Sequence, residues 1–140
     1  MSDLESAKSN LEGHTICLCR DGKIITSDKR GIAPMMGFIS EGKDLSGYSV
    51  ADLVVGKAAA MLFVKCKIKE VYAKTLSKSG LEILSLHGIK CEYGQLTERI
   101  INRDKTDICP MEKTVLNTSD VEEGYNLLKE KLNQIKKGGN

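Results

Sequence analysis

The segment from residue 49 to residue 65 constrains the fold more than any other part of the chain. Between residues 53 and 64 the only charged side chain is Lys57. A helix that is apolar on nearly every face is buried inside a domain. Ser49 and Asp52 are residue types that favour a helix N-terminus. We therefore expect a central helix that begins at Asp52 and packs on a β-sheet.

Shorter segments on both sides of this helix predict the strands of the sheet. An Asp-Gly dipeptide separates two apolar runs within residues 15–26, which is a strong β-hairpin signal. Residues 70–76 and 89–93 predict two more strands, and residues 79–87 predict a helix between them. A strand–helix–strand unit of this length forms a right-handed parallel crossover. The expected fold class is therefore α/β, with a mixed sheet.

Helices are also predicted near both ends of the chain. Residues 2–12 predict a short polar helix, and Pro34 is placed to open another one. A longer helix is expected over residues 119–137. Its apolar residues recur at spacings of four and three, and they are Val121, Tyr125, Leu128, Leu132 and Ile135. This stripe predicts a helix that docks on the rest of the domain or forms a seam between two copies.

Composition excludes several kinds of partner. The 140 residues are enough for one domain with its own core, which we place at residues 1–140. The net charge is only +2, from 21 basic and 19 acidic residues, and aromatic residues make up 4%. Nucleic-acid binding needs concentrated positive charge or stacking aromatic side chains. We therefore expect no nucleic-acid partner.

The location of the protein follows from its apolar runs and its cysteines. No apolar run reaches the roughly 20 residues that cross a bilayer. Residues 1–13 are too polar for a signal peptide. The five cysteines are an odd number, which favours reduced thiols over a disulfide framework. We expect a cytoplasmic protein that makes no contact with membranes.

Familiar cofactor and metal motifs are missing from the sequence. Lys57 follows a glycine, as in a phosphate-binding loop, but that motif needs a Ser or Thr next, where Ala58 stands. The only histidines are His14 and His87, and neither has a metal-ligand spacing from a pair of cysteines. We expect neither a cofactor nor a bound metal.

Three side chains are candidates for chemistry. Cys109 precedes a helix predicted to begin at Pro110, and the positive end of a helix stabilises a thiolate or binds an anion. Asp52 and Lys57 are the charged groups at the head of the buried helix, where a charge is costly unless it is paired or solvated. Each has a structural alternative, namely a buried thiol, a helix cap or a side chain that reaches the surface. These alternatives stay open at the level of sequence.

Several strings of the sequence resemble a known family when taken together. They are VGKAAA at residues 55–60, EVYAKTLS at 70–77, INRD at 101–104 and CPMEK at 109–113. The combination is similar to an uncharacterised family of small bacterial proteins, a domain of unknown function grouped with the cytidine-deaminase-like fold. The resemblance covers about residues 10–130. It implies a three-layer α/β/α sandwich.

The resemblance also implies what this fold lacks here. In true deaminases the central helix starts with H-x-E and the next helix with P-C-x-x-C, and these residues hold and use a zinc ion. The resemblance places Ala-Asp-Leu at residues 51–53 in the first position and Ser-Lys-Ser-Gly at residues 77–80 in the second. Neither string has the required His, Glu or Cys. We therefore expect the fold without its zinc site.

The fold further implies a cleft at the N-terminal ends of these two helices. We expect segments 101–104 and 109–113 to close over this cleft, or else only to anchor the C-terminal helices. In the first case they form a common site. Its catalytic candidates are Asp52 and Cys109, and its ligand-binding candidates are Lys57, Asn102, Arg103, Asp104 and Glu112.

Three functions are compatible with these patterns. The first is a zinc-free domain that binds a small anionic or nucleotide-like ligand, which helix N-termini and basic side chains favour. The second is a metal-independent enzyme that uses Cys109 or Asp52. The third is an interaction protein that forms a homo-oligomer through its C-terminal stripe.

Overall fold

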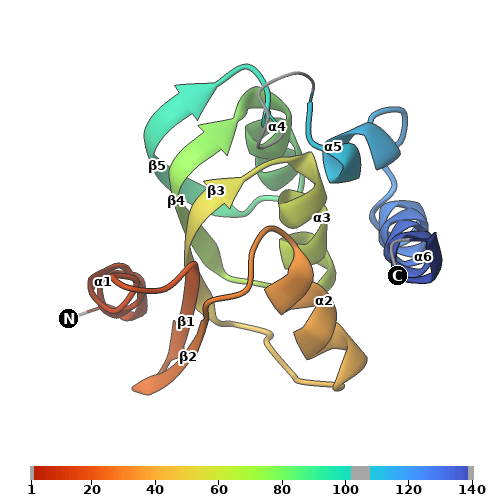
Figure 1. Cartoon of the computed structure of the whole chain (residues 1–140). Coiled ribbons are helices and arrows are strands. Elements are labelled where there is room, and N and C mark those ends of the chain that lie inside the picture. The colour runs from red at the N-terminus through yellow and green to blue at the C-terminus, as the bar shows by residue number, and fades with distance from the viewer. Residues whose placement is uncertain (1, 102–107, 139–140) are drawn as a thin grey trace.

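The computed structural model of this chain describes residues 2–101 and 108–138 (Figure 1). One sheet of five strands forms the centre, in the order β2-β1-β3-β4-β5. The strands are β1 (Ile16–Arg20), β2 (Lys23–Ser27), β3 (Ser49–Val55), β4 (Glu70–Ser77) and β5 (Lys90–Thr97). The helices are α1 (Asp3–Ser9), α2 (Ala33–Ser40), α3 (Lys57–Lys65), α4 (Lys78–Leu86), α5 (Pro110–Thr114) and α6 (Val121–Gly138).

The sheet is mixed, as the sequence predicts. Strand β1 pairs antiparallel with both β2 and β3, whereas β4 runs parallel to β3 and β5. The hairpin turn places Asp21 at φ 50° and Gly22 at φ 81°. Two positive φ angles in a two-residue turn match the right-handed twist of the flanking strands, and Asp-Gly accepts them at low cost. The predicted α/β class and mixed sheet are confirmed.

The start of the buried helix is predicted wrongly. Residues Ser49–Val55 form strand β3, and the helix α3 begins only at Lys57, after Gly56 in extended conformation. Strand β3 lies in the middle of the sheet with helices on both faces, so its residues do not alternate between apolar and polar. A short continuous apolar run cannot be assigned to strand or helix from its periodicity. Asp52 is therefore a residue inside a strand and caps no helix.

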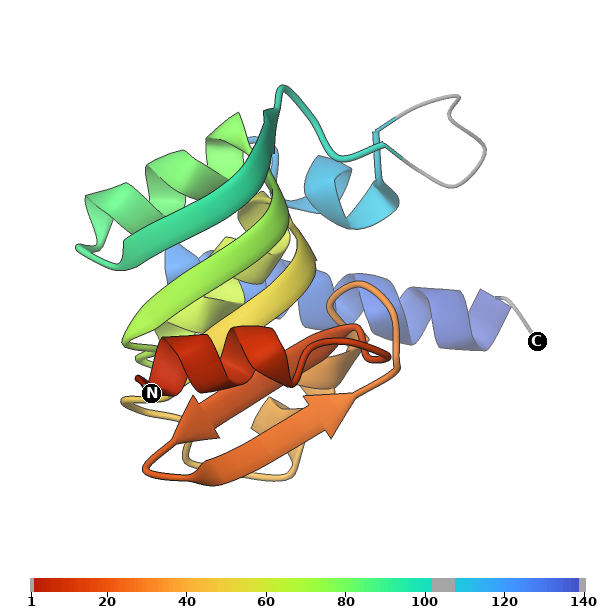
Figure 2. The ribbon, with the colours of Figure 1, turned by 90° about the vertical axis from the view of Figure 1, so that its left-hand side faces the viewer.

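Helices cover both faces of the sheet, which gives the predicted three layers (Figures 1 and 2). On one face lies α1, and its Ala7 and the following Leu11 pack against Cys17, Cys19 and Ala51 of the sheet. On the other face lie α2, α3 and α4, with the larger core between them and the sheet. Helix α3 is buried along most of its length, as its apolar sequence predicts.

The C-terminal helix α6 docks on the outer side of this second layer. Leu128 is fully buried, and Val121, Tyr125 and Leu132 are partly buried against the core. Ile135, farther along the same stripe, is 46% exposed. Docking of the stripe is thus seen for most of its length, and a seam between copies stays a prediction. Along residues 2–101 and 108–138, each helix is too short or too polar to cross a membrane.

Helix α4 provides a simple test of local structure. The buried Ser77 hydroxyl accepts a hydrogen bond of 3.0 Å from the Gly80 amide and so caps this helix. Replacing Ser77 by Ala is expected to lower the free energy of unfolding by about 1 kcal/mol, because the amide loses its acceptor. Urea denaturation measures this change. The control is Ser85→Ala, which removes an exposed hydroxyl farther along α4, and equal losses in the two variants would contradict the assignment.

Candidate functional site

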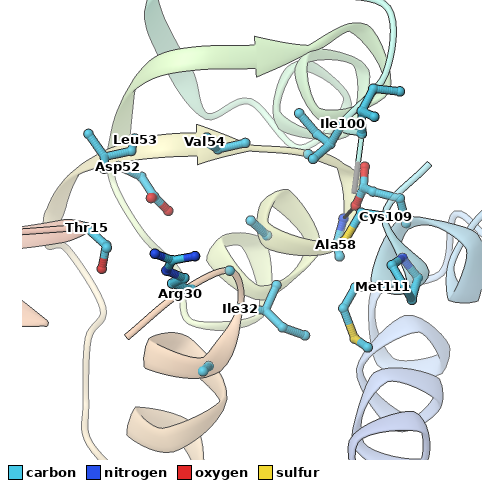
Figure 3. A pocket seen from close by; sticks show the side chains of 17 residues that line it. Thr15, Arg30, Ile32, Asp52, Leu53, Val54, Ala58, Ile100, Cys109 and Met111 are labelled. Atoms are coloured by element: carbon cyan, nitrogen blue, oxygen red, sulfur yellow. Dashed lines mark hydrogen bonds between the residues drawn. The ribbon is translucent and has the colours of Figure 1, made fainter. Parts of the chain in front are cut away.

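A cleft of about 740 Å³ lies on the face of the sheet that carries α2 and α3 (Figure 3). Its walls come from β3, the loop before α2, the start of α3 and the two segments that flank residues 102–107. Most of the lining side chains are apolar. The lining residues are Thr15, Arg30, Gly31, Ile32, Ala33, Asp52, Leu53, Val54, Gly56, Ala58, Ala59, Ile100, Ile101, Cys109, Pro110, Met111 and Glu112.

Asp52 is one of two buried acids that line this cleft, the other being Glu112. Strand β3 holds it in the middle of the sheet, and only 7% of the residue is exposed. Burial raises the pKa of Asp52 to about 8, although the backbone amides of Val54 and Leu53 favour its charged form. None of the ion pairs among the described residues includes Asp52. At neutral pH the side chain is therefore mostly a neutral acid, which both donates and accepts hydrogen bonds.

Arg30 supplies the positive charge at the mouth of the cleft. It lies in the loop between β2 and α2, its residue is exposed, and its guanidinium points toward Asp52 (Figure 3). The Thr15 hydroxyl helps to fix this loop, because its single proton is shared between the carbonyl oxygens of Ser27 at 2.9 Å and Lys29 at 2.5 Å. Sequence reasoning missed Arg30. The two consecutive basic residues at 29 and 30 were the available signal, but only the strand order brings them beside β3.

Glu112 closes the N-terminus of α3 from a distant part of the chain. Its carboxylate oxygens accept hydrogen bonds of 2.8 Å from the amides of Lys57 and Ala58. Helix α3 has no capping side chain of its own, because its N-cap residue is Gly56. A Cβ atom on Gly56 would lie 2.3 Å from the Glu112 carboxylate, so glycine is needed there. The positive end of α3 is therefore already occupied by an anion of the protein itself.

The remaining predicted site residues have different places. Cys109 lines the cleft just before α5, and its amide donates to the Ile100 carbonyl at 2.9 Å. Lys57 is not a lining residue, since its ammonium group donates to the Leu116 carbonyl at 3.2 Å. Asn102, Arg103 and Asp104 lie outside the described residues. The cleft thus brings together Asp52, Cys109 and Glu112, and the roles proposed for them stay predictions.

The two helix starts that the sequence resemblance compares with the zinc-binding positions of deaminases are the starts of α3 and α4. The first is the start of α3 at residues 56–58, not 51–53, and it carries Gly-Lys-Ala. The second, at residues 77–80, is the start of α4 as expected. Within the described part of the chain, no three His, Cys, Asp or Glu side chains are grouped so that they could hold a metal ion.

Solved structures resemble this chain to different degrees. The chain is similar to the crystal structure of a DUF1893 family protein from Thermotoga maritima, with 28% identity and a TM-score of 0.85 over 94% of this chain and 91% of that one. It has a weaker likeness to dCMP deaminase from the cyanophage S-TIM5, with 11% identity and a TM-score of 0.45 over 64% of this chain and 92% of that one.

A second weaker likeness is to a Thermotoga maritima diaminohydroxyphosphoribosylaminopyrimidine deaminase/5-amino-6-(5-phosphoribosylamino)uracil reductase. It has 16% identity and a TM-score of 0.45 over 64% of this chain and 34% of that one. Among curated proteins none matches this chain. The family model for DUF1893, described as a domain of unknown function, matches residues 7–132. The chain therefore belongs to the DUF1893 family.

Proposed function

We propose that this domain binds a small anionic or nucleotide-like molecule in the cleft. The observation that carries the proposal is the buried Asp52, which faces the cleft and takes part in none of the ion pairs among the described residues. A buried acid of this kind lowers the stability of a fold. Strongly perturbed acids that line a cleft concentrate at functional sites. Hydrogen bonding to a ligand would explain why an acid is kept at this buried position, whereas packing of the core does not explain it.

The other walls of the cleft define the ligand further. The volume of about 740 Å³ falls in the range for small-molecule sites. Apolar side chains such as Ile32, Val54 and Met111 fit a flat or aliphatic body. The neutral Asp52 pairs with a polar edge that offers both a donor and an acceptor. Arg30 suits a phosphate or carboxylate group, since its guanidinium binds such groups in a bidentate manner. The anion belongs at Arg30, because Glu112 already occupies the start of α3.

A thermal-shift screen with nucleosides, nucleotides and common metabolites tests the proposal. A molecule that binds the folded state raises the midpoint of thermal unfolding by mass action. For a nucleotide that binds, Arg30→Ala is expected to weaken the affinity by about tenfold, because the anion loses a charged hydrogen-bond donor. For the matching nucleoside the loss should be small.

The control for this screen is Lys23→Ala, which removes an exposed cation from β2 outside the cleft. It should leave every affinity unchanged. Asp52→Asn keeps the shape of the side chain but changes its hydrogen bonding, so it should weaken nucleotide and nucleoside alike. Equal affinities of the wild-type, Arg30→Ala and Asp52→Asn proteins for all hits would refute the proposed site.

A further inference from the structure

Helix α5 is an unusual wall for a cleft. It has five residues, far fewer than a helix needs to be stable without support. Its buried residue is an acid, Glu112, whereas Met111 is only partly buried. Three consecutive residues, Pro110, Met111 and Glu112, line the cleft. The buried side chain by which this wall contacts α3 is therefore polar.

The two ends of α5 are held differently. Directly after the helix, Val115 is fully buried in the core, and Lys57 binds the carbonyl oxygen of Leu116. On the side of the cleft the carboxylate of Glu112 binds the first amides of α3. The Cys109 amide, which donates to the Ile100 carbonyl at 2.9 Å, adds a weaker backbone tether at the same end. Breaking the Glu112 hydrogen bonds and then this one would free the helix at one end while Val115 kept the other end in place. This arrangement has the parts of a hinge and a latch.

We propose that α5 is a movable wall of the cleft and that Glu112 is the latch that holds it closed on α3. Release of the carboxylate lets α5 turn about the segment at Val115 and Leu116, which widens the path into the cleft. The opened state leaves two amides of α3 to water, so it is disfavoured but accessible. This device goes beyond ligand binding, because it controls access to the cleft whichever molecule enters.

The cap on α3 has a simpler solution that the chain does not use. The backbone of Gly56, at φ −106° and ψ −168°, is in the extended region that suits a Ser, Thr or Asp N-cap. A side chain at this position would satisfy the α3 amides locally. It would also collide with Glu112, so the two solutions exclude each other. The chain therefore makes the capping of α3 depend on the position of α5.

Cys109 offers a chemical reporter for the opening of this wall. It lies next to α5, and its side chain is partly buried in the cleft. The other four cysteines react slowly, since Cys17 and Cys19 are buried and burial raises the pKa of Cys66 and Cys91 to about 11. Alkylation by iodoacetamide, followed by mass spectrometry of the tryptic peptide that spans residues 106–113, measures the rate at Cys109 alone.

Glu112→Gln keeps the size of the side chain but loses the charge that binds the α3 amides. The rate of Cys109 alkylation is expected to rise by about tenfold or more, since the latch loses hydrogen bonds to a charged group. The control variant is Glu122→Gln, which alters an exposed acid on α6 that pairs with Lys65. It should leave the rate unchanged. An unchanged rate in Glu112→Gln overturns the proposal.

A double variant separates the latch from the cap. Gly56→Ser combined with Glu112→Ala gives α3 a local cap but leaves α5 untethered. Fast alkylation of Cys109 in this variant, at a stability near that of the wild type, supports the latch. Slow alkylation would mean that Glu112 only caps α3. If the double variant does not fold, hydrogen exchange of the Cys109 amide in Glu112→Gln decides the matter, because movement of the wall breaks its bond to the Ile100 carbonyl whereas loss of the cap alone does not. Faster exchange supports the latch, and unchanged protection rejects it. No ligand is used, so these outcomes are independent of the proposed function.

Discussion

Replacing Asp52 by Asn is expected to raise the free energy of unfolding at pH 7 by about 2 to 4 kcal/mol. In the folded protein burial raises the pKa of Asp52 to about 8, whereas an unfolded chain gives an aspartate a pKa of about 3.9. At pH 7 the side chain is ionised in the unfolded chain and must take up a proton on folding, which costs free energy. Asparagine has nearly the same shape and needs no proton. Its amide can still take part in hydrogen bonds inside the cleft.

The size of this effect changes with pH in a defined way, while its sign stays the same. Below pH about 4 the acid is protonated in both states, so the wild type and Asp52→Asn should have the same stability. Between pH about 4 and about 8 the folded state binds more protons than the unfolded state, and wild-type stability falls relative to the variant. Above pH 8 the difference becomes constant. Urea denaturation of both proteins at several pH values measures this curve.

A surface acid provides the matched control for this titration. Hydrogen bonds from the hydroxyl and the amide of Ser46 lower the pKa of Asp44. The contribution of Asp44 to stability is therefore present above the unfolded pKa and is lost as the pH falls. Asp44→Asn should show a dependence of opposite sign to Asp52→Asn. A difference between wild type and Asp52→Asn that stays constant from pH 5 to pH 8 would contradict the buried neutral acid.

The same substitution links stability to the proposed function. Active and binding sites often retain groups that destabilise the fold, and their removal stabilises the protein while it weakens function. Asp52→Asn is expected to do both, because it removes the proton uptake and changes the hydrogen bonds that the cleft offers. A neutral structural acid would produce the first effect without the second.

Most of the fold could be predicted from local patterns in the sequence. The Asp-Gly turn predicts the β1–β2 hairpin, and the alternation of apolar and polar residues after Gly88 predicts β5. Each of these signals is contained within a few consecutive residues. Strand β3 could not be recognised in the same way. Its neighbours in the sheet and the helices on both faces remove the alternation by which a strand is identified.

The site was harder to predict because its parts come from distant segments. The sequence identifies Asp52 as a charged residue within an apolar run. It predicts Asp52 wrongly as a helix cap, because the sequence does not show that β3 continues to Val55. Arg30 reaches the cleft only through the antiparallel pairing of β1 with β3. Glu112 binds amides 54 and 55 residues earlier in the chain, and no local pattern encodes such a contact.

Replacing Glu112 by Ala is expected to lower the free energy of unfolding by about 2 to 4 kcal/mol, because two amides of α3 lose a charged acceptor. Gly56→Ser alone should also destabilise the protein by about 1 to 3 kcal/mol. Its Cβ would lie 2.3 Å from a Glu112 oxygen and 2.8 Å from the Cγ1 atom of Ile100. Together the two changes should compensate in part, since removal of Glu112 makes room for the serine and the serine hydroxyl caps the helix.

Urea denaturation of the four proteins in this double-mutant cycle measures the coupling between the two positions. We expect the double variant to be more stable than the sum of the single losses allows, by about 1 to 3 kcal/mol. Additive losses of stability would show that a side chain at position 56 does not collide with the Glu112 carboxylate. Recovery of stability together with fast alkylation of Cys109 would separate the two roles of Glu112. The stability of helix α3 requires only a hydrogen-bond acceptor at its N-terminus, which a serine at position 56 can provide. Closure of the cleft requires in addition that the acceptor is part of α5, as Glu112 is.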